Sequence, residues 1–142
     1  MVDREVVRRR LQRLDEYLGF LARLGEYSRD ELLSEPERYG AAERFLQLAI
    51  EALCDMGNHV VADEGLGSVE AYGDIPRLLA KAGILDGTQS EQWVRMIGFR
   101  NILVHEYLEI DREVVYQVLQ ERVGDLSDLR QVFARYLCPE EG

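Results

Sequence analysis

Apolar side chains recur every three or four residues along most of this chain, a spacing that predicts amphipathic helices. The first series, which precedes a glycine at Gly25, comprises Val7, Leu11, Leu14, Leu18 and Leu21. The second series, which fades near Val61 or Ala62, comprises Tyr39, Ala42, Leu46, Ala49, Ile50, Leu53, Met56 and Val60. Each series predicts a long helix that buries one side against neighbouring helices.

Capping signals indicate where further helices begin. Residues 28–31, 34–37 and 88–91 each contain Ser or Thr followed three positions later by Glu, the pattern of a capping box. They predict the starts of a short helical turn, of the second long helix and of a fourth helix. Residues 74–76, Asp-Ile-Pro, predict the start of a third, shorter helix that ends at Gly83.

The last part of the chain continues the helical pattern. Asp111 caps a fifth helix, and apolar residues at helical spacing continue past Gly124 to Tyr136, as one helix or after a bend at Gly124. The glycine-rich residues 63–73 form the longest predicted loop, and no useful stretch alternates with a period of two. We therefore expect an all-α fold, an antiparallel helical bundle of four or five main helices, in a single domain over residues 1–142.

The charge balance narrows the classes of function. Among 142 residues, 17 Lys and Arg oppose 27 Asp and Glu, which gives a net charge of −10. Proteins that coat nucleic acid nonspecifically draw their affinity from many basic side chains, so this chain does not fit that class. Any RNA or DNA site must be a local one.

Other composition signals predict a cytoplasmic protein without metal or cofactor. The N-terminal residues lack the apolar stretch of a signal peptide, and no run reaches the ~18 apolar residues of a membrane span. Cys54 and Cys138 lie far apart, which speaks against a disulfide framework or a zinc ribbon. Neither His59 nor His105 stands at the spacing of a metal-binding pair.

Candidate chemistry concentrates in residues 100–107, Arg-Asn-Ile-Leu-Val-His-Glu-Tyr. Histidine is the side chain best suited to exchange a proton near neutral pH, and arginine binds phosphate through paired N–H groups. The segment therefore combines a proton carrier with a phosphate ligand, in the arrangement R-x4-H-x-Y.

This segment resembles the signature of the HEPN superfamily, specifically of the HepT-like toxins. The resemblance covers roughly residues 4–137. Besides the motif it includes residues 41–51, the Gly57-Asn58-His59 step, the Tyr72-Gly73-Asp74 turn, Leu79-Ala80 before Gly83-Ile84, and residues 96–101.

The resemblance implies a specific activity. HepT-like proteins are small all-helical homodimers that cleave RNA, either tRNA or mRNA, without a metal, by attack of a ribose 2′-hydroxyl on its own phosphate. On that likeness His105 serves as general base or acid and Arg100 holds the scissile phosphate. Asn101 supports the site.

The resemblance also implies a partner. Such toxins belong to type VII toxin–antitoxin systems, in which a minimal nucleotidyltransferase antitoxin (MntA-like) transfers AMP to the motif tyrosine. Tyr107 would then be the regulatory acceptor. AMP on this side chain would add bulk and negative charge where substrate phosphate must enter.

Helix geometry complicates the placement of the two catalytic candidates. On an ideal helix Arg100 and His105 point about 140° apart, whereas Asn101 and His105, four positions apart, share a face. Either the fourth helix ends or bends near Val104, or two chains of a dimer share the roles. Arg95 or Arg44 would stand beside Arg100 in the resulting cleft.

Non-catalytic interpretations of the same residues remain open. His105 could be a helix C-terminal residue stabilised by the helix dipole, Arg100 an ion-pair partner of Glu91 or Glu106, and Tyr107 a half-buried aromatic. The chain would then be a HEPN-type helical module that binds a nucleotide or the partner transferase, or a structural subunit. A cleft shared by Arg100 and His105 would favour the nuclease.

Overall fold

The computed structural model describes residues 4–106 and 108–138, and all regular secondary structure within them is helical. The helices are α1 (Arg4–Leu24), α2 (Arg29–Leu33), α3 (Pro36–Glu64), α4 (Asp74–Lys81), α5 (Gly87–His105), α6 (Arg112–Glu121) and α7 (Val123–Leu137). Helices α1, α3, α5, α6 and α7 have ten residues or more. The predicted all-α fold with four or five main helices is therefore confirmed.

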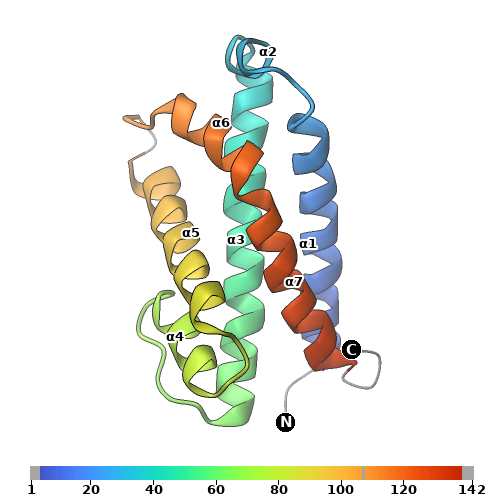
Figure 1. Ribbon diagram of the computed structural model, residues 1–142, viewed down its shortest axis with the longest axis vertical. Coiled ribbons are helices and arrows are strands. Elements are labelled where there is room, and N and C mark those ends of the chain that lie inside the picture. Colours follow the sequence, from blue (N-terminus) through green and yellow to red (C-terminus); the bar gives the residue numbers. More distant parts are fainter. Residues whose placement is uncertain (1–3, 107, 139–142) are drawn as a thin grey trace.

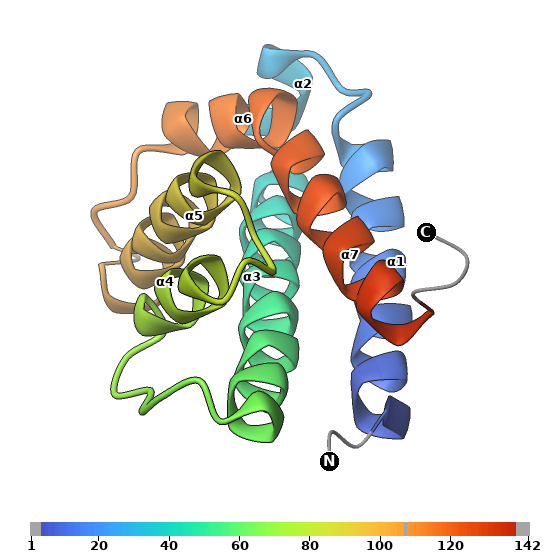
Figure 2. The ribbon, with the colours of Figure 1, turned by 60° about the horizontal axis from the view of Figure 1, so that its bottom comes forward.

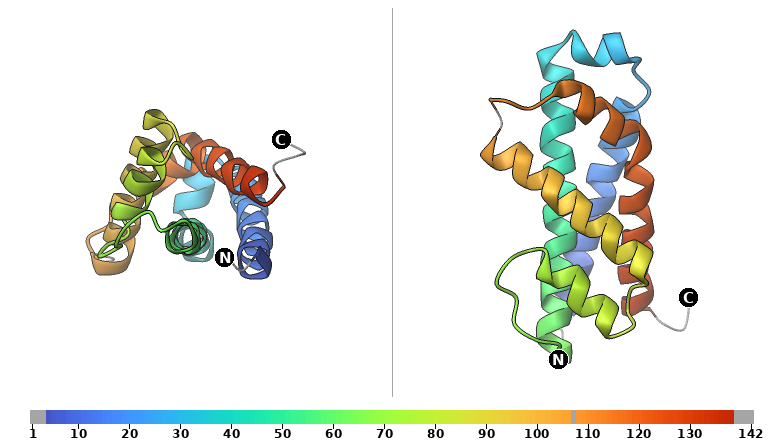
Figure 3. Two further views of the ribbon diagram at one scale, coloured as in Figure 1. Left: turned by 90° about the horizontal axis from the view of Figure 1, so that it is seen from below. Right: turned by 60° about the vertical axis from the view of Figure 1, so that its left-hand side comes forward.

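Helix α3 runs through the middle of the bundle, antiparallel to α1 on one side and to α5 on the other (Figure 1). Helix α7 returns between α1 and α5, while α6 and α2 lie across the end of the bundle where α3 begins (Figure 2). Seen along α3, one side of this helix carries no other helix (Figure 3). Arg44, Asp55 and Asn58 of α3 are exposed to solvent.

The hydrophobic core joins every helix, and α3 contributes the largest share because it contacts α1, α4, α5, α6 and α7. Trp93 of α5 is completely buried and meets the ring of Phe133 of α7 edge-on, with the ring centroids 5.8 Å apart. Met56 and Met96 are buried as well. Both methionines and Trp93 therefore belong to the core.

Gly57 allows α3 to approach α4 and α5 closely. A Cβ atom at this position would lie 2.5 Å from Cγ2 of Ile75 and 2.9 Å from Cη2 of Trp93. Both neighbours are fully buried. The absent side chain of Gly57 therefore sets the distance between α3 and the helix that carries the R-x4-H motif.

Two predicted caps are present. The Ser28 hydroxyl accepts from the Glu31 N–H, and the Glu31 carboxylate accepts from the Ser28 N–H, which completes the capping box. The Asp111 carboxylate accepts from the backbone N–H of Glu113 at the start of α6. Residues 65–73 form the predicted loop between α3 and α4.

Two other predicted capping boxes are wrong. The N-cap of α3 is Glu35, without a side-chain bond, and the Ser34 hydroxyl instead donates to the carbonyl of Glu31 in the preceding helix. Helix α5 begins earlier than predicted, because the carboxylate of Asp86 accepts from the N–H of Gln89 and completes a capping box there.

One predicted helix boundary is confirmed and two differ from expectation. Helix α4 begins at Asp74 as predicted, and the Asp74 carboxylate accepts hydrogen bonds from two backbone N–H groups of the preceding loop. Helix α3 continues to Glu64 and ends at Gly65, which has a φ of +62°. The helical pattern is interrupted at Arg122, which caps the end of α6 and the start of α7, so Gly124 lies in the first turn of α7. In the sequence, Pro139 predicts the end of the last helix, and this residue lies outside the described residues.

Within the described residues, no helix is both long enough and apolar enough to cross a bilayer.

Candidate functional site

The residues of the R-x4-H motif occupy the last two turns of α5, near the connector to α6 (Figure 1). The helix remains regular through His105, and the N–H of Glu106 still bonds to the carbonyl of Ile102. The end of α5 thus falls one residue beyond Val104, close to where the sequence predicts an end or a bend. Tyr107, the predicted AMP acceptor, lies outside the described residues.

Arg100 points from α5 toward α3 and forms an ion pair there. Its Nε and Nη2 atoms each lie 2.8 Å from Oε2 of Glu51, and Nη1 donates to Oδ1 of Asn101 at 3.1 Å. The ring of Tyr72, in the α3–α4 loop, lies 5.1 Å from the guanidinium carbon. The guanidinium is therefore held by a carboxylate, an amide and an aromatic ring.

The surroundings of this ion pair are partly buried. Only 17% of the Arg100 side chain and 26% of the Glu51 side chain are exposed. Gln47, one turn earlier on α3, donates to the same Oε2 of Glu51 at 3.1 Å. Burial raises the pKa of the Tyr72 phenol, so this ring is neutral at physiological pH. Electrostatic interactions are less screened here than on the open surface.

His105 and Asn101 both lie at the surface, on the solvent side of the last turns of α5. They stand four positions apart, so they share a face of the helix as expected. No hydrogen bond or ion pair joins His105 to Arg100 in the described part of the chain. Because α5 stays helical through His105, the two side chains leave it about 140° apart. One chain alone therefore does not bring the two predicted catalytic groups together.

Arg100 forms an ion pair, as one of the non-catalytic interpretations supposed, but its partner is neither of the two glutamates named there. Glu91 instead faces Arg95, at 3.9 Å on the exposed surface of α5. Arg95 lines a hollow between α4 and α5 rather than the face that carries Arg100. The carboxylate that binds Arg100 is Glu51, 49 positions earlier in the chain.

Three large apolar residues are exposed close to the motif in sequence. They are Ile102 in α5, Leu108 in the connector and Val114 in α6, with exposures of 42%, 85% and 42%. An exposed large apolar side chain gains free energy when another macromolecule covers it. They are therefore candidates for the contact with a second copy of the chain.

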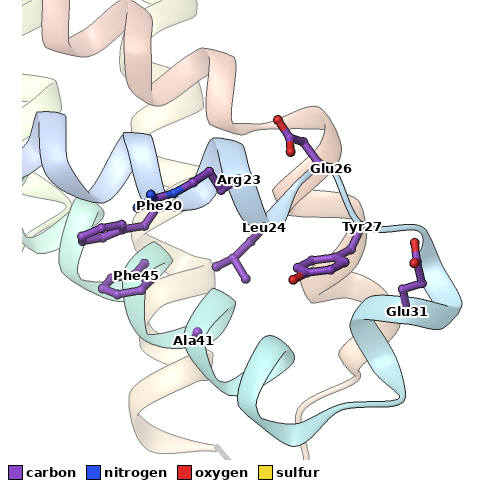
Figure 4. Close-up of a pocket in the computed structure, with 8 residues that line it drawn as sticks. All are labelled: Phe20, Arg23, Leu24, Glu26, Tyr27, Glu31, Ala41 and Phe45. Carbon is purple, nitrogen blue, oxygen red and sulfur yellow. The ribbon is translucent and has the colours of Figure 1, made fainter.

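A separate hollow of about 690 Å³ lies between the end of α1 and the N-terminal half of α3 (Figure 4). The rings of Phe20 and Phe45 lie 4.7 Å apart on its wall, and Arg23 stacks over Phe20 at 5.0 Å. Its lining includes neither histidine of the chain, and Arg100 and Asn101 do not reach it. The hollow is therefore distinct from the predicted site.

Sequence reasoning did not assign a role to three residues around the Arg100–Glu51 ion pair, namely Glu51, Gln47 and Tyr72. Glu51 and Gln47 lie on the predicted second helix, four positions apart and beside its apolar stripe. A polar pair at the edge of an otherwise buried face is the signal that could have drawn attention to them. Nothing in the local sequence identifies Tyr72 as a neighbour of Arg100.

Comparison with known proteins identifies relatives over most of the chain. Residues 8–133 match the family model described as Ribonuclease HepT-like. The mRNA nuclease HepT of Shewanella oneidensis is 32% identical over 87 residues, which are 61% of this chain and 65% of that protein. The tRNA nuclease HepT of Aphanizomenon flos-aquae is 32% identical over 116 residues, which are 80% of this chain and 78% of that protein. The match to the Shewanella protein thus spans just under two thirds of its length.

The fold has a counterpart among solved structures. The tri-AMPylated HEPN toxin of Shewanella oneidensis, in complex with MNT antitoxin, superposes with a TM-score of 0.83 at 23% identity. The alignment covers 94% of this chain and 98% of that toxin, so the whole helical arrangement is shared. Together with the family model over residues 8–133, these matches show that the chain belongs to the HepT-like ribonuclease family.

Proposed function

We propose that this protein is the toxin of a type VII toxin–antitoxin pair and acts as a metal-independent endoribonuclease on tRNA or mRNA. The whole chain, residues 1–142, would act as one HepT/HEPN-like helical domain in the cytoplasm, where its RNA substrate is found. The observation that carries this proposal is the arginine, asparagine and histidine at the end of α5, in a chain of the HepT-like ribonuclease family. The named nuclease relatives support the same activity.

The reaction needs groups that move protons and a group that stabilises charge. The ribose 2′-hydroxyl loses its proton to a base, its oxygen bonds to phosphorus, and the 5′-oxygen leaves with a proton from an acid. His105 supplies the base or the acid, because its imidazole is exposed and can reach the substrate to accept or donate a proton. Arg100 binds the phosphate oxygens through N–H groups that Glu51 and Asn101 leave free, and Asn101 supports this arrangement.

A homodimer would bring an arginine and a histidine together even though Arg100 and His105 point in different directions from α5. In a two-fold dimer, the histidine of one chain approaches the arginine of the other, and the two histidines provide the acid and the base. The exposed Ile102, Leu108 and Val114 are suited to such a contact, because the two copies would cover them together.

The proposed regulator is an MntA-like minimal nucleotidyltransferase that transfers AMP to Tyr107. The structural relative of Shewanella oneidensis is an AMPylated toxin in complex with MNT antitoxin, which supports such a partner. Co-expression with the transferase is expected to abolish toxicity and to add AMP to Tyr107, as read by peptide mass spectrometry. Tyr107→Phe should remain toxic in its presence, and modification of that variant at the same level would contradict the assignment.

The catalytic assignment is tested by expression of the wild-type chain and His105→Ala, followed by growth and RNA integrity. His105→Ala should lose cleavage by about 10²- to 10⁴-fold, the usual contribution of general acid–base catalysis. His59→Ala is the matched control, because His59 is an exposed histidine on α3, outside the motif. Equal toxicity of wild type and His105→Ala would refute the role of His105.

A second candidate function is a non-catalytic HEPN-type module that binds a nucleotide or the partner transferase. The observation that favours it is the pairing of Arg100 with Glu51, which offsets the charge that a phosphate would meet. This alternative predicts tight binding of the partner, no RNA cleavage by the purified protein, and unchanged binding by His105→Ala.

A further inference from the structure

The Arg100 guanidinium already donates hydrogen bonds to other residues of the protein. A guanidinium carries five N–H donors. In this structure one N–H of Nε and one of Nη2 point to Glu51, and one of Nη1 points to Asn101. One N–H on each terminal nitrogen therefore remains for a substrate. The three occupied donors fix the plane of the group before any substrate arrives.

From this geometry we infer that Glu51 is a positioning residue for the proposed nuclease, which holds Arg100 in place so that its two remaining N–H groups meet the scissile phosphate. The inference rests on the proposed function. Glu51 itself would not touch the RNA; it acts through Arg100. The ligand concerned is the RNA phosphodiester that Arg100 binds.

The Glu51–Arg100 ion pair is more buried and has more hydrogen bonds than an ordinary surface ion pair. Oε2 of Glu51 accepts from Nε and Nη2 of Arg100 and from Gln47, so its position is defined from two helices. The neighbouring pair between Arg10 and Asp55 joins α1 to α3 through one 3.0 Å contact, with side chains 45% and 52% exposed. Exposed pairs of that kind are mobile and contribute little, whereas the Glu51–Arg100 pair is partly buried.

The Tyr72 ring restricts the same guanidinium from another direction. It lies 5.1 Å from the guanidinium carbon, within the range of a cation–π contact. With a carboxylate at its edge and a ring over its face, Arg100 has few other rotamers available. A charged donor that is already oriented stabilises a developing phosphate charge without the cost of reorganisation during the reaction.

This arrangement predicts separate effects on turnover and on substrate binding. Loss of the Glu51 charge should lower kcat, because a displacement of Arg100 by about 1 Å can reduce the rate about 100-fold. The KM for RNA should stay constant or fall, because a carboxylate that repels the phosphate has been removed. A general loss of structure would instead lower the amount of active enzyme and the thermal midpoint.

The test measures cleavage of a labelled RNA oligonucleotide that the wild-type protein cuts, with purified full-length variants. Glu51→Gln preserves the size of the side chain and removes its charge, and it should lower kcat about 10- to 100-fold. Asp55→Asn is the matched control, one turn further along α3, where it breaks an ion pair that does not involve Arg100. This control should keep wild-type kcat and KM.

A double-mutant cycle separates positioning from a general role in folding. If Glu51 acts through Arg100, Glu51→Gln should cause no further loss of activity in an Arg100→Ala background. A second readout is the Nε–H resonance of Arg100 by NMR, which should exchange slowly with solvent in wild type and in Asp55→Asn. It should exchange rapidly in Glu51→Gln.

The possible outcomes separate this inference from the proposed function. If wild type cleaves RNA and Glu51→Gln matches it, or exceeds it because Glu51 merely masks Arg100, the positioning role is refuted. Additive losses in the double mutant would refute it too. If wild type cleaves no RNA under any condition, the proposed function fails, and the role of Glu51 in catalysis fails with it.

Discussion

Gly57 offers a direct test of how tightly α3 packs against α4 and α5. Replacement by alanine would place a Cβ atom 2.5 Å from Cγ2 of Ile75 and 2.9 Å from Cη2 of Trp93. Carbon atoms pack best at about 3.5 to 4.0 Å, so both contacts are about 1 Å too short. Ile75 is stiff at χ1, and both neighbours are fully buried, so neither can move cheaply.

The expected cost follows from two opposing effects. Overpacking a buried site costs about 1 to 3 kcal/mol, and two short contacts with rigid neighbours place Gly57→Ala near the upper value of about 3 kcal/mol. Alanine regains about 1 kcal/mol through its higher helix propensity. The net loss of unfolding free energy is then about 2 kcal/mol. Gly40→Ala, in the same helix with no atom within 4 Å of the new Cβ, should gain about 1 kcal/mol.

Urea unfolding followed by far-UV circular dichroism measures both variants against wild type. With a slope of about 2 kcal/mol per molar urea, Gly57→Ala should lower the midpoint by about 1 M, while Gly40→Ala should raise it. All samples need the same protein concentration, because a dimer would couple stability to association. A midpoint of Gly57→Ala at or above that of wild type would refute the close-packing explanation.

Three further predictions concern the cap of α5, the cysteines and the alkaline pH range. Asp86→Ala should lower the unfolding free energy by about 1 kcal/mol, whereas Thr88→Ala should have little effect; equal losses in urea unfolding would contradict the observed cap. Burial raises the pKa of the Cys54 thiol to about 12, so a thiol reagent should label only the exposed Cys138 in the folded protein, and labelling of both at equal rates would contradict this packing. Burial, together with a hydrogen bond to a carboxylate, raises the pKa of Tyr136 from 10.0 to about 12. The contribution of the neutral Tyr136 phenol to stability is then complete below about pH 10 and is lost as the pH rises toward 12. Tyr136→Phe should therefore lose less stability than wild type over that pH window, as measured by urea unfolding. An unchanged dependence of stability on pH in this variant would refute the prediction.

Helix positions could be predicted from the sequence because burial imposes its own spacing. The series from Val7 to Leu21 faces the core in α1 with Val7, Leu11, Leu14 and Leu21 buried, as periodicity requires. Capping was harder to predict, since residues 86–89 and 88–91 both fit a capping box in overlapping register. The local sequence does not determine which of them forms, and the structure uses Asp86.

The surroundings of Arg100 could not be predicted, for a different reason. A local pattern offers Glu91 and Glu106 as ion-pair partners, because both stand within a few turns on the same segment. The actual partner, Glu51, is 49 positions away and becomes a neighbour only through the antiparallel packing of α3 and α5. The divergence of Arg100 and His105 was predictable from helix geometry, since it depends only on their separation along a regular helix.

The start of α1 and the end of α7 lie side by side, which bears on how the protein can be tagged or permuted. A guanidinium nitrogen of Arg4 donates to the carbonyl of Leu137 at 3.0 Å, at the end of the bundle away from the C-terminus of α5 (Figure 1). An affinity tag or fluorescent label attached before α1 or after α7 would start from the end of the bundle opposite the C-terminus of α5, which carries His105. The same proximity makes a circular permutant with a short linker between these helices feasible, with new ends opened elsewhere on the surface.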